Sequence, residues 1–395
     1  MKLHRIEELI ARVNPVVVET YFYFACGIIL GSGFSIIGPS LPYLAELTNK
    51  SLDQVSDLFL IMPFGFILGI FIFRYFAFRE WLKSLFIFGV LAHIIFLPII
   101  PYTSVFLLVA FMFFVISIAR GVINVGANVL LLDLHKKKAA PYLTAFHFCF
   151  GMGATLAPVI VGYNLEHQDT ILGAYIFFAL INVPLLLLLL KFKTNAKPLD
   201  ENLVPPPRKS RIKLLTLIYL YLFCYVLVEA GYGTWIFAYM SIEEGGVMAV
   251  AQAGIFTSFY WLSFTLGRLF AVFLSFYFQP IKIILAHSAI SIVAIILMIL
   301  FTDNLWVMWP ANIALGLGLS VMFPCMIFYS RDKFNVPPKT IGNYFIAALS
   351  GAMAGPWVLG QIFVIDRDLI FYPMLVAVLI IPVATLFIRG MEKPA

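Results

Sequence analysis

The sequence predicts an all-α membrane protein with 12 transmembrane helices, arranged as two pseudo-symmetric six-helix bundles. Three observations predict it: a very apolar composition, the number of long apolar runs, and an internal repeat. Of the 395 residues, 62% are hydrophobic and 12% are charged, whereas soluble domains carry roughly 25% charged residues. A surface in contact with water needs more charge than this, so we expect the chain to be embedded in a lipid bilayer.

Twelve apolar runs are long enough to cross a bilayer, because a helix of about 20 residues spans its hydrocarbon core. The predicted spans are residues 16–40, 55–77, 82–100, 104–132, 139–163, 169–191, 214–240, 247–277, 280–301, 304–328, 339–363 and 368–389.

A polar stretch at residues 191–213 divides these runs into six and six. It carries seven basic residues and the run Pro205–Pro207, which favours an extended conformation without helix. We therefore predict an N-terminal bundle at residues 1–190, a cytoplasmic linker at 191–213 and a C-terminal bundle at 214–395.

The distribution of basic residues predicts the orientation. On the predicted topology, 23 of the 26 Lys and Arg residues fall on one side, Lys50 and Arg367 fall on the other, and Arg120 lies inside a span. Basic loops stay in the cytoplasm, so we expect both termini there and the chain in the plasma or inner membrane. The segment Leu3–Val13 has apolar residues at helical spacing, which fits an interfacial helix or a frayed terminus.

An internal repeat relates the two halves. Residues 153–162 read GAxxAPxxxG and residues 351–360 read GAxxGPxxxG, 198 positions later, and the same offset carries Gly69 onto Gly267. Equivalent fifth helices in two six-helix halves imply a pseudo-two-fold axis along the membrane normal. This symmetry is typical of transporters with a binding site near the bilayer midplane.

Small residues predict where helices pack closely. Gly27 with Gly31, and Gly65 with Gly69, form GxxxG pairs inside predicted spans. Such pairs let two helix backbones approach each other, so we expect helix contacts at both places.

Several classes of function lack their signatures. The four cysteines stand alone in apolar segments, which predicts neither a disulfide framework nor a metal site. The basic residues lie in short loops between apolar runs, so nucleic acid is not an expected partner. HExxH, a nucleophile elbow and paired catalytic carboxylates within one span are absent from the sequence, and we expect no enzyme and no cofactor.

Five short motifs together resemble one family. They are Gly38–Pro42, Gly126–Leu131, His147 with Gly153–Pro158, Glu229–Trp235 and Gly267–Leu269. With these motifs the chain resembles the major facilitator superfamily, and within it the branch of fucose–proton symporters and sodium-dependent glucose transporters. The resemblance implies alternating-access transport, with the first, fourth, seventh and tenth spans lining the cavity.

The chain departs from that family at two places. The loop after the second span, within residues 69–79, lacks the aspartate and the second glycine that the family carries there. Asn124 stands where the branch often has an acidic residue. The resemblance therefore implies altered gating contacts and one missing carboxylate.

Glu229 is the first candidate for a functional residue, because it lies deep in the seventh span. A charge at that depth costs about 2.5–3.5 kcal/mol on insertion scales and normally faces the protein interior. Its expected role is a coupling carboxylate or a ligand for solute hydroxyls. The alternative is a structural ion pair or a protonated acid.

Arg120, Asn124 and Asn128 are spaced by four residues and share one face of the fourth span. Polar groups on one stripe point away from lipid, so they are expected to form a polar wall for the solute. The alternative is hydrogen bonding between helices. Arg120 is also a candidate partner for Glu229.

Five aromatic side chains in the seventh and eighth spans are candidates for contacts with the solute. Aromatic faces suit the apolar faces of sugar rings, and their polar tips can reach hydroxyls. The alternative is core packing or an interfacial belt. The five are Tyr232, Trp235, Tyr239, Tyr260 and Trp261.

His147, in the fifth span, is a candidate proton relay near neutral pH, with simple packing as the alternative. His93 and His287 are expected to be packing residues, and the sequence assigns no role to Asn312 or Gln361.

These candidates together predict a secondary transporter of a small polar solute, with a sugar or sugar-like polyol first. Asn124, Asn128, Glu229 and the aromatics would form the site, and Glu229, Arg120 and His147 would serve coupling. The coupling ion would be H⁺ or Na⁺, with uniport left open, and we expect a monomer. Alternatives are an exporter of lipophilic or lipid-like compounds and a receptor or scaffold that does not transport.

Overall fold

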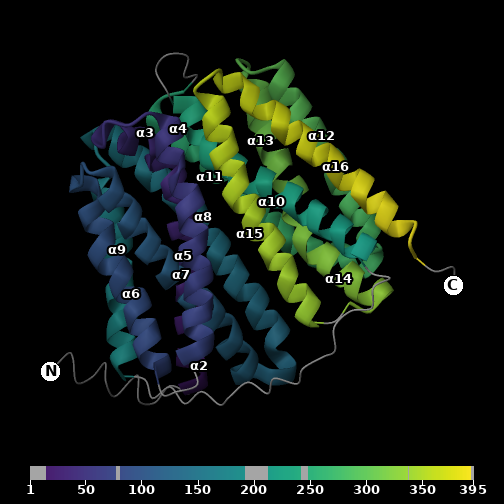
Figure 1. The fold of residues 1–395 in the computed structure, drawn as a ribbon, viewed down its shortest axis with the longest axis horizontal. Helices are drawn as coiled ribbons and strands as arrows, with labels where there is room; N and C mark the ends of the chain where they lie inside the picture. The colour runs from purple at the N-terminus through teal and green to yellow at the C-terminus, as the bar shows by residue number, and fades with distance from the viewer. Residues whose placement is uncertain (1–14, 77–80, 192–211, 242–247, 337, 393–395) are drawn as a thin grey trace.

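The computed structural model describes residues 15–76, 81–191, 212–241, 248–336 and 338–392 (Figure 1). Regular structure in these ranges is helical throughout, and twelve of the helices are long and apolar enough to cross a membrane. The predicted 12-helix fold is confirmed. The expected helix at Leu3–Val13 and most of the expected linker lie outside the described residues.

The first half of the described chain forms six crossing helices, two of them in two pieces. They are α2 (Pro15–Ser35) with α3 (Ile37–Leu47), α4 (Leu52–Ser56) with α5 (Leu58–Phe76), α6 (Leu82–Ile99), α7 (Phe106–His135), α8 (Ala139–Gln168) and α9 (Leu172–Lys191). Short 3-10 turns follow α6 at Ile100–Tyr102 and α7 at Lys136–Lys138.

The second half repeats this plan. Its helices are α10 (Ile212–Ser241), α11 (Val250–Tyr277), α12 (Pro280–Leu300), α13 (Leu305–Ser320) with α14 (Met322–Phe334), α15 (Pro338–Phe363) and α16 (Phe371–Arg389), which follows a 3-10 turn at Arg367–Ile370. The predicted ends agree to within a few residues, except that the first crossing continues to Leu47 and the tenth to Phe334.

Prolines explain why the first and tenth crossings are broken. A proline inside a helix cannot donate to the carbonyl four residues before it. Pro39 deprives the Ser35 carbonyl, at the last residue of α2, and Pro324 deprives the Ser320 carbonyl, at the last residue of α13. Each break therefore lies one turn before its proline, in the first crossing of the N-terminal half and the fourth crossing of the C-terminal half.

The glycines of the repeat pack in equivalent ways. A Cβ at Gly153 would overlap the Ile28 carbonyl on α2, and a Cβ at Gly351 would overlap the Phe223 carbonyl on α10. In each half the fifth crossing thus packs tightly against the first, as the predicted pseudo-symmetry requires.

The remaining glycine predictions are also confirmed. Gly27 and Gly31 bring α2 against α8, and Gly65 and Gly69 bring α5 against α7. Gly267, the counterpart of Gly69, brings α11 against α13. The second and fourth crossings are therefore paired in both halves.

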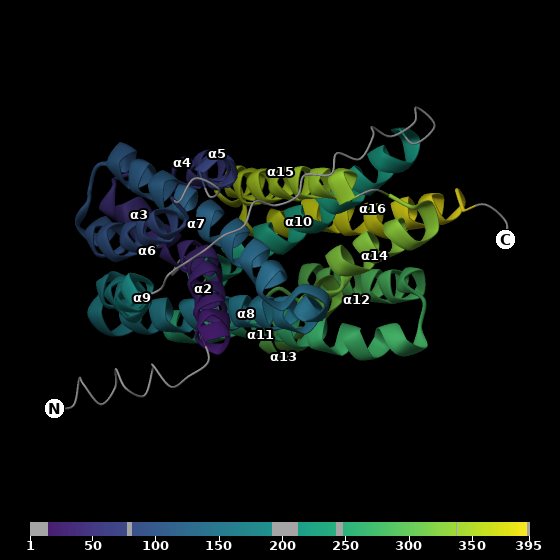
Figure 2. The same cartoon turned by 90° about the horizontal axis from the view of Figure 1, so that it is seen from below.

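The two halves meet mainly toward the face opposite the two ends of the described chain. Twelve crossings put the start of α2 and the end of α16 on the same face, here called the terminal side; the opposite face is called the distal side. The elements in contact between the halves are α8 with α11, α3 with α10, and α4 and α5 with α15. Figure 2 shows α8 beside α11 and α5 beside α15, whereas in Figure 1 the ribbons of α2 and α14 diverge toward the terminal side.

Candidate functional site

An ion pair lies inside the C-terminal bundle. Arg268 Nη2 on α11 is 3.9 Å from Glu229 Oε1 on α10, and 29% and 14% of the two side chains remain exposed. The guanidinium carbon of Arg268 also lies 4.3 Å from the ring centre of Phe264, within cation–π range. Tyr225, one turn before Glu229, interacts electrostatically with both ions.

Aromatic residues of α11 support this pair and reach the other half. The Tyr260 hydroxyl donates to the Glu229 backbone carbonyl at 3.1 Å. Trp261 packs against Gly233, where a side chain would collide with its ring. Trp261 also meets Phe34 of α2 edge-on, with ring centres 5.6 Å apart. The halves therefore touch through two rings close to the ion pair.

Arg120 lies on the N-terminal side of that ring contact. Its guanidinium carbon is 5.6 Å from the ring centre of Phe34, and 8% of the residue is exposed. Among the described residues, Glu229 pairs with Arg268 and not with Arg120. The expected Arg120–Glu229 pair is therefore wrong in this conformation, because Arg268 from the neighbouring helix reaches the carboxylate instead.

Asn124 and Asn128 are half-buried on the same helix as Arg120. Asn128 Nδ2 donates to the Asn124 carbonyl at 2.8 Å and lies 3.5 Å from the Asn124 side-chain oxygen. Both side chains keep unused hydrogen-bonding capacity. The predicted polar stripe on α7 is present, with Arg120 at its buried end.

His147 of α8 is exposed and lies close enough to Arg268 for an electrostatic interaction. The two helices that carry them pack tightly one turn away, where a side chain at Gly151 would collide with Thr265. The structure thus brings His147 of one half to the Arg268–Glu229 pair of the other.

Three of the aromatic residues predicted to contact the solute use their polar groups for hydrogen bonds within the protein. Tyr232, Trp235 and Tyr239 are fully buried, so their polar tips need internal partners. The Tyr232 hydroxyl donates to Asn312 Oδ1 at 2.7 Å, Trp235 Nε1 to the Pro356 carbonyl at 2.7 Å, and the Tyr239 hydroxyl to Asp368 Oδ1 at 2.6 Å. In this conformation these three join helices of the C-terminal bundle.

The structure adds residues that the sequence reasoning missed. Arg268 was predicted only as one of the basic residues on the cytoplasmic side, although it shares a helix face with Phe264 and Tyr260. His93 of α6 was expected only to pack, but its Nε2 is buried without a partner. Asn312 links three helices, because it accepts from Tyr232 and donates to the Phe256 carbonyl at 2.8 Å. Asn312 is fully buried, and the sequence alone does not show this burial, which would have identified it as a linking residue.

Polar contacts close the distal side. They link the outer ends of α4, α5 and α8 to those of α11 and α15, so both halves contribute to each contact. Trp357 Nε1 donates to Asp57 Oδ1 at 3.0 Å, Gln361 Nε2 to the Asp53 carbonyl at 3.2 Å, and the Ala251 N–H to Glu166 Oε2 at 2.6 Å.

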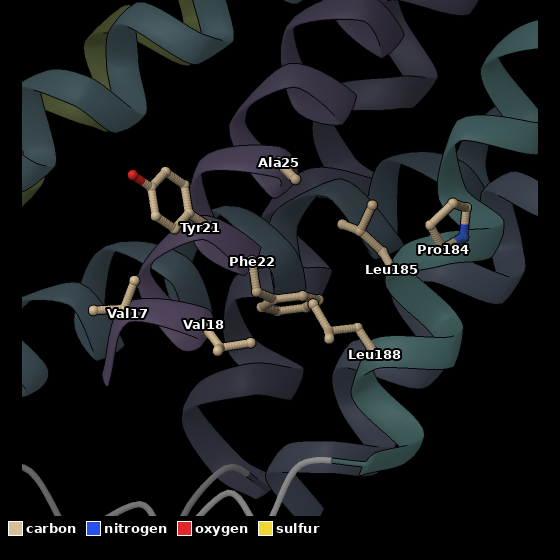
Figure 3. Close-up of a pocket in the computed structure, with 8 residues that line it drawn as sticks. All are labelled: Val17, Val18, Tyr21, Phe22, Ala25, Pro184, Leu185 and Leu188. Atoms are coloured by element: carbon tan, nitrogen blue, oxygen red, sulfur yellow. The ribbon is translucent and has the colours of Figure 1, made fainter. Parts of the chain in front are cut away.

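One surface hollow lies away from these residues. It has a volume of about 330 Å³, lies between α2 and α9, and is lined almost wholly by apolar side chains (Figure 3). The Tyr21 hydroxyl points away from the other lining residues in Figure 3. This apolar lining does not match a polar solute. The candidate site is the region around Glu229, Arg268 and Arg120 because ions and rings of both halves come together there.

Comparisons with known proteins agree with this architecture. The family profile described as Major Facilitator Superfamily matches residues 23–393. Sodium-dependent glucose transporter 1A of Mus musculus is 28% identical over 370 residues, covering 84% of this chain and 86% of that protein.

Two solved structures share the fold. The nucleoside transporter NupG superposes with a TM-score of 0.72 at 12% identity, covering 96% of this chain and 100% of that one. FucP, solved in the outward conformation, superposes with a TM-score of 0.62 at 17% identity, covering 94% of this chain and 99% of that one.

Proposed function

The chain belongs to the major facilitator superfamily, and we propose that it carries a small, polar, sugar-like solute across the membrane by alternating access. The expected family is confirmed by the profile match over residues 23–393. Membership makes the chain a multi-pass membrane transport protein and not an enzyme.

Two observations support a sugar-like solute. The relative from mouse is named a sodium-dependent glucose transporter. In this chain, rings from both halves meet at Phe34 and Trp261, Arg120 lies beside Phe34, and the half-buried Asn124 and Asn128 follow Arg120 on α7. Flat apolar surfaces beside hydrogen-bonding groups suit a polyol, whose C–H faces stack while its hydroxyls bond.

The observation that carries the proposal is the partly exposed Glu229–Arg268 pair inside the protein. A carboxylate there attracts a cation, and binding of H⁺ or Na⁺ to Glu229 would weaken its attraction to Arg268. We propose that this exchange couples solute movement to a cation. We propose His147 as the residue that passes the proton, and its electrostatic interaction with Arg268 of the opposing helix supports this role.

The basic asymmetry of the loops supports a cytoplasmic terminal side. With that orientation, the contacts on the distal side make this conformation closed to the outside. One chain contains both halves of the proposed site, so we propose a monomer as the transporting unit, in the plasma or inner membrane.

A flux assay tests the proposal. The purified chain is reconstituted into liposomes, and uptake of labelled glucose and other sugars is followed under a pH gradient, a sodium gradient or neither. We expect one gradient to drive accumulation. Glu229→Gln should remove accumulation and keep exchange of solute across the membrane. Glu46→Gln, an exposed carboxylate at the end of α3, is the matched control.

Two outcomes count against the proposal. Vesicles without solute flux for any sugar-like compound would favour a receptor or scaffold. Unchanged accumulation in Glu229→Gln would remove the coupling role from this residue.

A further inference from the structure

Arg120 is a buried cation without a counter-ion. Arg268 has Glu229, but the described residues place no carboxylate within 4 Å of Arg120, and its guanidinium donates no hydrogen bond to any of them. Its Nε is fully enclosed and unpaired. Arginine stays protonated in proteins, and an unpaired charge away from water is costly. Something that is not part of the chain is needed to balance it.

His93 lies next to this cation. Its Nδ1 is 2.8 Å from the Gly89 carbonyl, and a carbonyl can only accept, so Nδ1 carries the ring proton. In the neutral ring, Nε2 is then an acceptor. That nitrogen is buried without a partner, as is Arg120 Nε. A donor-rich cation and a hydrogen-bond acceptor therefore stand side by side, both unsatisfied.

Gly33 of α2 faces both groups, and its missing side chain leaves room there for about one methyl group. A Cβ built at Gly33 would lie 3.7 Å from His93 Nε2 and 3.9 Å from Arg120 Nε, which are ordinary contact distances. The next residue, Phe34, stacks beside Arg120 and meets Trp261 of the other half. The unsatisfied pair thus adjoins the aromatic contact at which the proposed function places the solute.

We propose that the transported solute is a sugar acid, held by its carboxylate on Arg120 and by a neighbouring hydroxyl on His93. The carboxylate accepts from the guanidinium, and the hydroxyl donates to Nε2, so one α-hydroxy acid satisfies both groups. The rest of the chain or ring of the solute lies toward Phe34 and Trp261. The inference rests on the proposed function, since it specifies the class of solute for the same site.

Ligand-dependent thermal stability of the purified full chain tests the inference without transport. The probes are the α-hydroxy acids sodium gluconate and sodium galactonate and the neutral sugars glucose and galactose, with sodium chloride at equal ionic strength. We expect the two acids to stabilise the protein at concentrations about tenfold or more below those of their neutral counterparts, because hydrogen bonds to charged groups are the strong ones.

Four variants locate the effect. Arg120→Gln should abolish the preference for acids, Arg120→Lys should keep part of it, and Arg389→Gln, at the exposed end of α16, should leave it intact. His93→Phe should remove the preference for gluconate over 2-deoxygluconate, which lacks the α-hydroxyl. The comparison of acids with neutral sugars on the unaltered chain keeps the test valid if a variant folds poorly.

Equal stabilisation by acids and neutral sugars, stabilisation by chloride alone, or no effect of either acid would overturn the inference. Flux of neutral glucose that Arg120→Gln does not affect would also overturn it, while leaving the proposed function in place. Absence of flux for acids and neutral sugars alike would instead sink the proposed function.

Discussion

Arg268 and Glu229 approach within 3.9 Å across the contact of α10 and α11, while Arg120 faces Phe34 on the other side of the interface between the halves. The carboxylate therefore belongs energetically to one arginine and not to the other. The identity of this partner determines which pair of charge changes, at Glu229 and Arg268 or at Glu229 and Arg120, can compensate for each other.

Exchanging the charges of the pair should restore part of what either change destroys. We expect Glu229→Arg and Arg268→Glu each to abolish solute exchange, because each leaves two like charges side by side. The double variant should recover measurable exchange in liposomes. Combining Glu229→Arg with Arg120→Glu should recover none, and recovery there would show that Arg120 is the partner.

Weakening the distal contacts should shift the conformational equilibrium. Trp357→Phe removes the donor to Asp57, a hydrogen bond of about 0.5–1.5 kcal/mol, so the distal side should open about two- to tenfold more often. Spin labels at Tyr102→Cys and Trp306→Cys, which are 72% and 92% exposed on this side, should report longer distances. The background lacks the four native cysteines.

Trp309→Phe is the matched control for that experiment, because the ring partners of Trp309, Phe256 and Phe259, belong to the C-terminal bundle. Equal distance distributions for Trp357→Phe and the control would contradict a role of Trp357 in closure.

Adding a methyl group at a helix crossing should destabilise the fold. A Cβ at Gly31 would overlap the Phe150 carbonyl, so Gly31→Ala should cost about 1–3 kcal/mol through overpacking and lower the melting temperature in detergent. Gly390→Ala, whose Cβ would find its nearest neighbour at 3.5 Å, should change it little. A similar loss in both would argue against tight packing of α2 on α8.

Removing the Asn312 amide should strand two buried groups. Asn312→Ala leaves the Tyr232 hydroxyl and the Phe256 carbonyl without their partner, at about 1–3 kcal/mol for a buried unsatisfied group. We expect a clear fall in melting temperature, and Tyr232→Phe should offset part of it. Asn343→Ala, an exposed asparagine of α15, is the control. Additive losses in the double variant would refute the link.

The fold was predictable because lipid exposure imposes one composition on every crossing helix. Apolar length located all twelve, and the repeated glycines identified which helices pair. The breaks after Ser35 and Ser320 were missed, since prolines are tolerated inside transmembrane helices and their effect depends on neighbouring helices. The depth of Arg268 in the membrane could not be predicted either. Because α11 has 28 residues, more than are needed to cross the bilayer, its composition did not show that Arg268 lies beside Glu229.

The candidate site was only partly predictable, because hydrogen-bond partners come from distant positions. Glu229 was identified from depth alone. Whether the Tyr232 hydroxyl is available depends on Asn312, 80 positions away, and no local pattern reports that distance. His93 was assigned to packing, because the sequence does not show which residues surround its side chain. Only the structure shows that its Nε2 lies near Gly33 and Arg120 and has no hydrogen-bond partner.

The edge-on meeting of Phe34 and Trp261 has a consequence for the empty protein. An aromatic pair contributes about 0.5–1.5 kcal/mol beyond its buried area, only one to a few times the thermal energy, so this contact alone would not hold the two halves together. A solute bound between them, as proposed above, would offer each ring a new surface in exchange. The same two side chains would then join the halves in both states of the transporter, by direct contact when it is empty and through the bound solute when it is loaded.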